Sequence, residues 1–435
     1  MREHTGVGEL RAGSGQAGAN VAMRRREIEL ASVLVLIGTM LVDMIGFGIV
    51  LPLLPYYALR FGASDWMVGP LVASFSMAQL LAAPFWGKIS DRYGRRPLIL
   101  VGLACSAVSY VLFGLATTVT VLFISRIVQG ASGGTVAVAQ AYVADTTAPE
   151  RRAQVLGWLS AASGAAFMVG PAIGSWAWRW GGHAAPGLVA AALCLVNLGF
   201  AWRFLPEPAE AWGREAGSRL AVPPLSDVLR SAVREPLSRM IAVYFLGMGA
   251  FASITAIFPL FLQTRFGIDE STIGYVFLYI GLVSVLVRGA TVGPLVRHLG
   301  EPFVSRLGAA LLGVGLGLGA VADTYPLLGL SFTFIAGGTG TLFPPLAALI
   351  SRSAAPEVQG STLGINQFFG GVGRVFGPLW GAAVFDIYGS GAPFLTAGVG
   401  ASLAFLLTLR LRRSEVLVAE SARASRVESG SEVAS

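Results

Sequence analysis

The sequence predicts an all-α integral membrane protein whose twelve transmembrane helices form two pseudo-symmetric six-helix bundles. Composition, long apolar runs and an internal repeat support this prediction. Of the 435 residues, 54% are hydrophobic and only 13% are charged, whereas soluble domains contain about 25% charged residues. Apolar runs of about 20 residues, long enough to cross a bilayer as helices, recur along the whole chain.

The predicted spans fall into two sets of six, separated by a polar segment. They lie near residues 30–58, 66–86, 97–116, 120–144, 154–178 and 185–205, and then near 238–262, 271–292, 302–321, 326–350, 358–384 and 392–410. The spacing predicts five segments: an N-terminal tail (1–27), a first bundle (28–205), a linker (206–237), a second bundle (238–413) and a C-terminal tail (414–435). We expect both polar tails to be disordered and cytoplasmic.

Within the predicted linker, a short amphipathic helix is expected to lie at the membrane interface. Ser226 can cap this helix, and Arg230 and Arg234 would then face lipid headgroups or water.

An internal repeat relates the two sets of spans. Residues 148–150 (Ala-Pro-Glu) recur at 355–357, and the same offset aligns Gly170-Pro171 with Gly377-Pro378. A register kept over this length indicates a duplicated six-helix unit. Parallel repeats of this kind are used by transporters that work by alternating access.

The distribution of basic residues predicts the orientation in the membrane. The net charge is +7, but the basic residues cluster in alternate loops, which argues against a surface for nucleic acid. Basic loops remain on the cytoplasmic side. The pattern therefore predicts a multi-pass protein of the cell (plasma) membrane with both termini in the cytoplasm.

No metal, cofactor or enzymatic chemistry is predicted. Cys105 and Cys194 lie within apolar runs, and His4, His183 and His298 are scattered, so neither a disulfide framework nor a metal-ligand spacing is present. No nucleophile, base and orienting group occur together.

A short polar loop at residues 87–96 joins the second and third predicted spans. Its ordered spacing makes a generic basic hairpin the weaker interpretation. Arg95 is placed to bridge Asp91 to Asp145, at the end of the fourth span, whereas the matching loop of the second half (293–300) contains no acid. The residues that define this spacing are Gly87, Asp91, Arg92, Gly94, Arg95 and Arg96.

Asp43 and Arg126 are ionisable residues embedded in apolar runs, which is costly and therefore favours a function. Asp43 lies roughly 20 Å from the cytoplasmic end of the first span, and Arg126 roughly 9 Å from the outer end of the fourth. In a core of about 30 Å these depths nearly coincide, so the two side chains can meet if their helices are neighbours. The pair is either a proton switch, which we favour, or a static buried ion pair.

Small residues mark the fifth span in the pattern Gly164, Gly170, Pro171 and Gly174, which is typical of close helix packing with a proline kink. Arg374 is expected to snorkel outward or to pair with Asp386, and Arg288 to snorkel to the cytoplasmic end of its span. Polar and aromatic residues that can line a substrate site, or equally serve in packing, are Gln129, Gln140, Tyr244, Tyr279, Phe343, Asn366 and Gln367.

The 87–96 loop, Arg126 with Gln129-Gly130, and the 164–174 pattern together resemble the twelve-helix drug:proton antiporters of the major facilitator superfamily, particularly the tetracycline/proton antiporters. The resemblance covers the whole chain and is strongest in residues 40–180. It implies that the loop, with Asp145, is a conformational latch, that residues 164–174 form the antiporter motif, and that Asp43 and Arg126 couple protons. Because the matching 293–300 loop of the second half contains no acid, we expect any latch chemistry to be one-sided.

The expected function is proton-coupled export of amphipathic organic compounds by alternating access. The protein would work as a monomer in a lipid bilayer, with protons and a small molecule as its substrates. The alternatives are a proton symporter or facilitator for a small metabolite, and a non-transporting receptor or assembly factor on the same scaffold.

Overall fold

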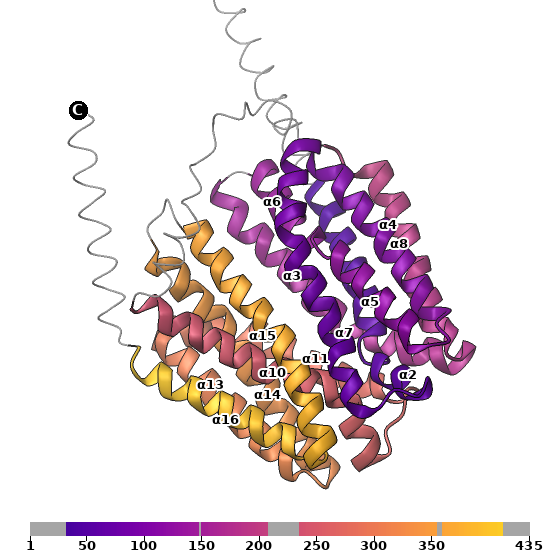
Figure 1. Cartoon of the computed structure of the whole chain (residues 1–435). Helices are drawn as coiled ribbons and strands as arrows, with labels where there is room; N and C mark the ends of the chain where they lie inside the picture. Colours follow the sequence, from indigo (N-terminus) through magenta and orange to yellow (C-terminus); the bar gives the residue numbers. More distant parts are fainter. Residues whose placement is uncertain (1–31, 148, 208–234, 355–358, 412–435) are drawn as a thin grey trace, which may run out of the picture.

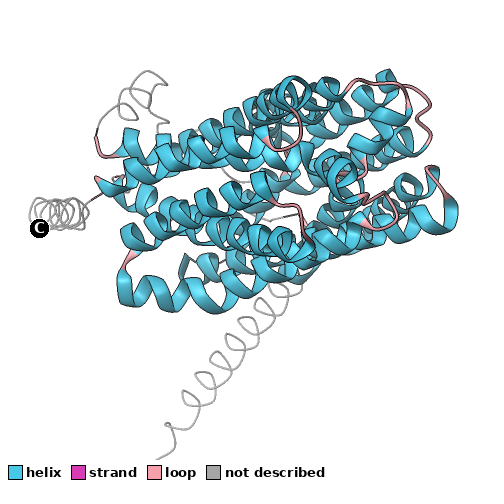
Figure 2. Cartoon of the chain, turned by 90° about the horizontal axis from the view of Figure 1, so that it is seen from below, coloured by secondary structure: helices cyan, strands magenta, loops and turns pink. Residues whose placement is uncertain are grey.

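The computed structural model describes residues 32–147, 149–207, 235–354 and 359–411. The predicted tails (1–27 and 414–435) lie outside these residues, as does the interfacial helix expected around Ser226. The described chain contains twelve helices long and apolar enough to span a membrane, and every regular element drawn in Figure 2 is a helix.

The first six spans run between residues 32 and 204. Residues 32–50 form the first helix, which continues into α2. The labelled elements are α2 (Leu54–Arg60), η1 (Asp65–Met67), α3 (Val68–Tyr93), α4 (Arg95–Gly114), α5 (Val119–Ser132), α6 (Thr135–Thr146), α7 (Pro149–Gly181) and α8 (Ala184–Phe204). Here α4 packs against α5 and α8, and α3 packs against α5.

The last six spans run between residues 237 and 409. Their elements are α10 (Leu237–Phe266), α11 (Ile273–Leu286), η3 (Val287–Thr291), α12 (Val292–Leu299), α13 (Glu301–Val321), α14 (Tyr325–Ser353), α15 (Gln359–Tyr388) and α16 (Ala392–Leu409). In this group α13 packs against α14 and α16, and α10 packs against α15 and α16. Element η3 is a single turn of π-helix within an otherwise α-helical span.

Glycines in the left-handed region make the sharpest turns between spans. Gly94, with φ 93°, separates α3 from α4, and Gly300, with φ 82°, separates α12 from α13. A residue with a Cβ is strained at such φ values, so glycine allows two helices to follow each other almost without a loop. The equivalent positions of Gly94 and Gly300 reflect the repeat.

The two groups of six helices converge at one end of the molecule (Figure 1). The group before the linker meets the group after it chiefly through α7 against α11 and α3 against α15. We call the end at which α8 stops and α10 starts the linker end, and the opposite end, where Arg60 and Phe266 lie, the far end.

Burial differs between these two ends. Five of the six buried residues of α3 lie between Val68 and Ser76, near the far end. The buried residues of α11 likewise lie within its first five positions, and α12 contains none. The halves are therefore packed together at the far end and separate toward the linker end.

Candidate functional site

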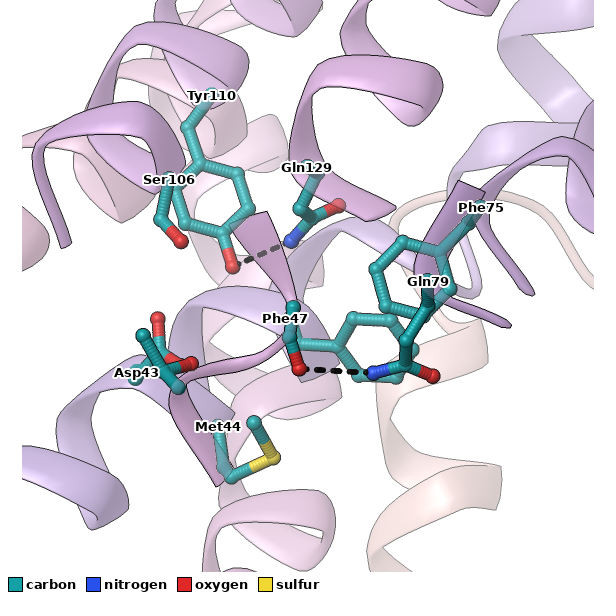
Figure 3. A pocket seen from close by; sticks show the side chains of 10 residues that line it. Asp43, Met44, Phe47, Phe75, Gln79, Ser106, Tyr110 and Gln129 are labelled. Carbon is teal, nitrogen blue, oxygen red and sulfur yellow. Dashed lines mark hydrogen bonds between the residues drawn. The ribbon is translucent and has the colours of Figure 1, made fainter. Parts of the chain in front are cut away.

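Asp43 lines a small cavity in the first half of the molecule, together with aromatic and polar side chains (Figure 3). The Asp43 side chain is buried, and its carboxyl interacts with the hydroxyls of Ser106 and Thr135. The cavity has a volume of about 30 Å³, which is room for about two water molecules. It is lined by Asp43, Met44, Phe47, Phe75, Gln79, Ser106, Tyr110, Gln129, Gly133 and Thr135.

Arg126 is buried close to this cavity without an ion partner. It is 2% exposed, and none of the described carboxylates lies within 4.0 Å of it. Its guanidinium lies over the ring of Phe113 at 5.4 Å, and its Nη2 has no hydrogen-bond partner in the described chain. An unpaired buried guanidinium is costly, so the position favours function over packing.

Asp43 and Arg126 therefore do not form the contact that their predicted depths allow. Tyr110 of α4 lies close to both of them, and Figure 3 shows its ring beside Asp43 and Gln129. A Cβ at Gly46, one turn after Asp43, would lie 2.8 Å from the Tyr110 ring. On the other side, Gln129, one turn after Arg126, donates a hydrogen bond to the Tyr110 hydroxyl at 2.7 Å. Depth along a helix does not reveal an aromatic ring contributed by a third helix.

The loop between α3 and α4 forms the ion bridge predicted from the sequence. Arg95 contacts Asp91 at 2.8 Å and Asp145 at 2.9 Å. The carboxylate of Glu207 also accepts hydrogen bonds from the backbone N–H groups of Arg95 and Arg96, at 2.7 and 3.0 Å. Sequence reasoning missed Glu207, which lies beyond α8 and meets the start of α4 only in the folded chain.

The second half has an ion pair at the corresponding place, so the expectation of one-sided latch chemistry is wrong. Glu301 contacts Arg352 at 2.8 Å. Glu301 is the first residue of α13 after Gly300, as Arg95 is the first residue of α4 after Gly94. The two pairs thus have opposite polarity. The acid was missed because it stands one residue beyond the 293–300 segment.

The glycines at 170 and 174 hold two helices of the first half together. A Cβ at Gly170 would lie 2.8 Å from the Ile45 carbonyl oxygen, and one at Gly174 would lie 2.7 Å from the Ile49 carbonyl oxygen. Gly164 has no atom within 4 Å of such a Cβ. Only the last part of this pattern is therefore needed for close approach of helices.

The residues predicted to line a substrate site are distributed over both halves. Gln129 lines the Asp43 cavity, while Gln140 and Gln367 are exposed and do not line it. Tyr279 is half-exposed and its hydroxyl lies 2.7 Å from that of Thr333. Asn366 is buried, and its Oδ1 has no hydrogen-bond partner in the described chain.

Tyr244 and Phe343 form an edge-to-face pair, with 5.2 Å between ring centroids. Beside them, the structure corrects the expectations for two arginines. Arg374 lies at the middle of the span Ser361–Tyr388 and makes no ion pair with Asp386. Arg288 lies in η3, eleven residues before the end of its span, with its side chain against Gly340.

The far end is closed by polar contacts between the two halves. Arg60 pairs with Glu270 at 2.9 Å, and the Tyr56 hydroxyl donates to the Ile268 carbonyl at 2.9 Å. The backbone N–H of Gly274 donates to Ser175 Oγ at 2.9 Å. These contacts must break before the far end can open.

The structure consists of two six-helix bundles that contain buried charges and contact each other at one end. This arrangement is typical of polytopic membrane transporters. A family model of the Major Facilitator Superfamily matches residues 36–378 and 290–431. The chain belongs to this superfamily, whose members are transporters and not enzymes.

Relatives include Multidrug resistance protein 2 of Bacillus subtilis (strain 168), which is 31% identical over 84% of this chain and 91% of that protein. The class C Tetracycline resistance protein of Escherichia coli is 30% identical over 88% of this chain and 96% of that protein.

Among solved structures, the human organic anion transporter MFSD10 (TETRAN) matches with a TM-score of 0.66 and 26% identity, over 87% of this chain and 99% of that one. The nucleoside transporter NupG matches at a TM-score of 0.70 and 14% identity, over 88% and 100% of the two chains, and shows the shared fold.

Proposed function

We propose that this transporter exports amphipathic organic compounds in exchange for protons, by alternating access. The observation that carries the proposal is the buried Asp43 carboxyl, which lines a cavity with room for water, is hydrogen-bonded to two neutral hydroxyls and has no ion pair among the described residues. A carboxyl group can bind and release a proton, so Asp43 can be either neutral or ionised in this cavity. The names of the drug- and tetracycline-resistance relatives support drug or natural-product efflux.

Proton coupling requires that the surroundings of Asp43 differ between two conformations. Tyr110 lies close to both Asp43 and Arg126 and accepts a hydrogen bond from Gln129 at 2.7 Å. A movement of α4 against α5 that withdraws the tyrosine would bring the guanidinium nearer the carboxyl. Arg126 would then favour proton release from Asp43, and its withdrawal would favour proton uptake.

The conformation seen here is assigned to the state open to the cytoplasm. The linker end carries the basic loop with Lys88, Arg92 and Arg96, and basic loops remain cytoplasmic. We therefore place both termini in the cytoplasm and the protein in the plasma membrane. Each chain contains both bundles, so we propose that the monomer is the working unit, with Arg95, Asp91 and Asp145 as its latch and residues 164–174 as the antiporter motif.

The test is proton movement in energised inside-out membrane vesicles that contain the protein and a pH-sensitive dye. Tetracyclines, lipophilic cations, organic anions and neutral drugs are added singly. We expect compound-dependent proton release that is lost in Asp43→Asn and kept in Asp323→Asn, which changes an exposed loop aspartate.

Unchanged coupling in Asp43→Asn would refute the role of Asp43. If folded protein responds to no compound, a metabolite symporter or facilitator, or a non-transporting receptor or assembly factor, becomes the better account.

A further inference from the structure

Cations outnumber acids near the middle of the described spans, where Arg126 is buried, Arg374 is half-buried and Arg288 is exposed. Arg126, Arg288 and Arg374 lie there together with a single carboxylate, Asp43. None of the three arginines has a described carboxylate within 4.0 Å. Intramembrane ionisable groups default to function and call for a partner, and the described chain does not supply one.

Arg374 lies at the interface between the two halves. A Cβ at Gly371 would lie 2.9 Å from Leu80 Cδ1 of α3 and 3.7 Å from Arg374 Nη2. The guanidinium is thus close to the surface that the first half presents to the second. On its other side a Cβ at Gly370 would touch the ring of Tyr244 at 2.6 Å and Arg374 Nη1 at 3.7 Å.

Arg288 stands at the opposite end of the same row of side chains. Tyr244 contacts Phe343 edge to face, and Gly340 lies one turn before Phe343 on α14. A Cβ at Gly340 would lie 3.3 Å from Arg288 Cγ and 3.7 Å from its Nε. Arg374 thus lies beside Tyr244, Tyr244 pairs with Phe343, and Arg288 lies one helical turn away from Phe343 at Gly340; we call these four residues the arginine–aromatic row.

Two other arginines of the second half have a structural role, because each donates a hydrogen bond to a backbone carbonyl of a neighbouring helix. Arg265 donates to the Ala320 carbonyl at 2.9 Å, and Arg306 donates to the Thr408 carbonyl at 3.3 Å. Arg288 and Arg374 donate to none of the described residues, and both remain partly exposed. Their N–H groups are available to a ligand.

We propose that the arginine–aromatic row binds an amphipathic organic anion, with its carboxylate or sulfonate on a guanidinium and its apolar ring against Tyr244 and Phe343. Guanidinium groups match such anions with paired, charge-assisted hydrogen bonds, and aromatic pairs favour flat apolar partners. The same two charges repel organic cations, which gives the site selectivity. This inference rests on the proposed transport function and specifies its substrate class.

The test compares two probes that differ by one charged group, 8-anilinonaphthalene-1-sulfonate and its neutral counterpart N-phenyl-1-naphthylamine. Binding to the purified full-length protein is measured by equilibrium dialysis against micelles without protein. We expect the wild type to prefer the sulfonate, and Arg374→Gln and Arg288→Gln each to weaken sulfonate binding by about tenfold or more. Binding of the neutral amine should persist, as a sign that the variants are folded.

Arg203→Gln, which changes an exposed arginine at the end of α8, is the matched control and should leave sulfonate binding unchanged. Equal affinity of the wild type for both probes, or unchanged sulfonate affinity in both glutamine variants, would overturn the proposal. If a glutamine variant also loses the amine, Arg374→Lys and Arg288→Lys decide, because a retained preference for the sulfonate supports the site and its loss contradicts it.

The vesicle assay keeps this inference separate from the proposed function. Proton release that depends on Asp43, together with sulfonate binding that ignores both arginines, would overturn the anion site alone. Sulfonate binding that depends on the arginines, without any proton release, would leave the site in place and remove proton coupling.

Discussion

Arg95 and Glu301 occupy equivalent positions but carry opposite charges. Each is the first residue of a helix that follows a glycine with positive φ. The N-terminus of a helix favours an acid and disfavours a cation. Arg95 accordingly lies among Asp91, Asp145 and Glu207, whereas Glu301 is stabilised by its helix in addition to its ion pair with Arg352.

The two ion pairs should therefore differ in their contribution to stability. Arg95 and Asp145 have side chains only 14% and 9% exposed, and removing one partner of a buried pair costs about 3–5 kcal/mol. The side chain of Arg352 is 50% exposed, and a pair that water reaches contributes about 1 kcal/mol or less. We expect Arg95→Gln to lower the unfolding temperature clearly more than Arg352→Gln, as measured by thermal unfolding in detergent. Equal losses in the two variants would contradict the asymmetry.

At the residue scale, the sequence predicts charges better than it predicts their partners. The bridge from Arg95 to Asp91 and Asp145 was predictable because both acids stand at span ends that must share a face. The separation of Asp43 from Arg126 was not, because hydropathy gives the depth of a residue but neither the rotation of its helix nor the side chain that comes between.

At the scale of elements, one helix contact is used twice. In the first half Gly170 and Gly174 approach the carbonyl oxygens of Ile45 and Ile49, and in the second half Gly377 and Gly381 approach those of Gly249 and Ser253. Each contact brings the first span of a bundle against the fifth. The repeat of Gly-Pro at 170–171 and 377–378 in the sequence predicts the equivalence, but the partner helix appears only in the structure.

Substitutions within the 164–174 pattern should separate packing from helix propensity. Gly170→Ala places a methyl group 2.8 Å from a backbone oxygen, so the two helices must move apart. Gly164→Ala meets nothing within 4 Å and gains about 1 kcal/mol of helix propensity. We expect the first variant to lose folded yield and transport, and the second to keep both, as judged by size-exclusion chromatography and the vesicle assay. A harmless Gly170→Ala would show that this helix contact is not needed.

At the scale of the whole molecule, the far-end contacts join two bundles that are otherwise apart toward the linker end. Arg60 with Glu270 and Tyr56 with the Ile268 carbonyl cross the interface directly. The sequence predicts the twelve spans and the pseudo-symmetry, because length and hydropathy determine them. The conformational state was beyond prediction, since it depends on a small free-energy difference between two packings of the same helices.

Weakening the far-end ion pair should shift the population toward the form that is open at that end. Ser175, which lies between the halves and is buried, is replaced by cysteine in a background with Cys105→Ala and Cys194→Ala. We expect Glu270→Gln to speed labelling of this cysteine by a membrane-impermeant maleimide by roughly two- to fivefold, because a partly exposed ion pair contributes little free energy. Glu235→Gln, which removes an exposed acid paired with Arg239 at the linker end, is the control. A labelling rate equal in both variants would exclude a locking role for the far-end pair.

The π turn η3 explains how the two halves differ in length and yet keep ion pairs at corresponding places. Gly69 lies 25 residues before Gly94, whereas Gly274, which packs on α7 as Gly69 packs on α15, lies 26 residues before Gly300. In a regular α-helix one added residue would rotate everything after it by about 100° and turn Glu301 away from Arg352. A π turn absorbs that residue locally. The π turn contains Arg288, where α3 has Ala82 and Ala83, so the second half carries its additional residue and its additional charge at the same point.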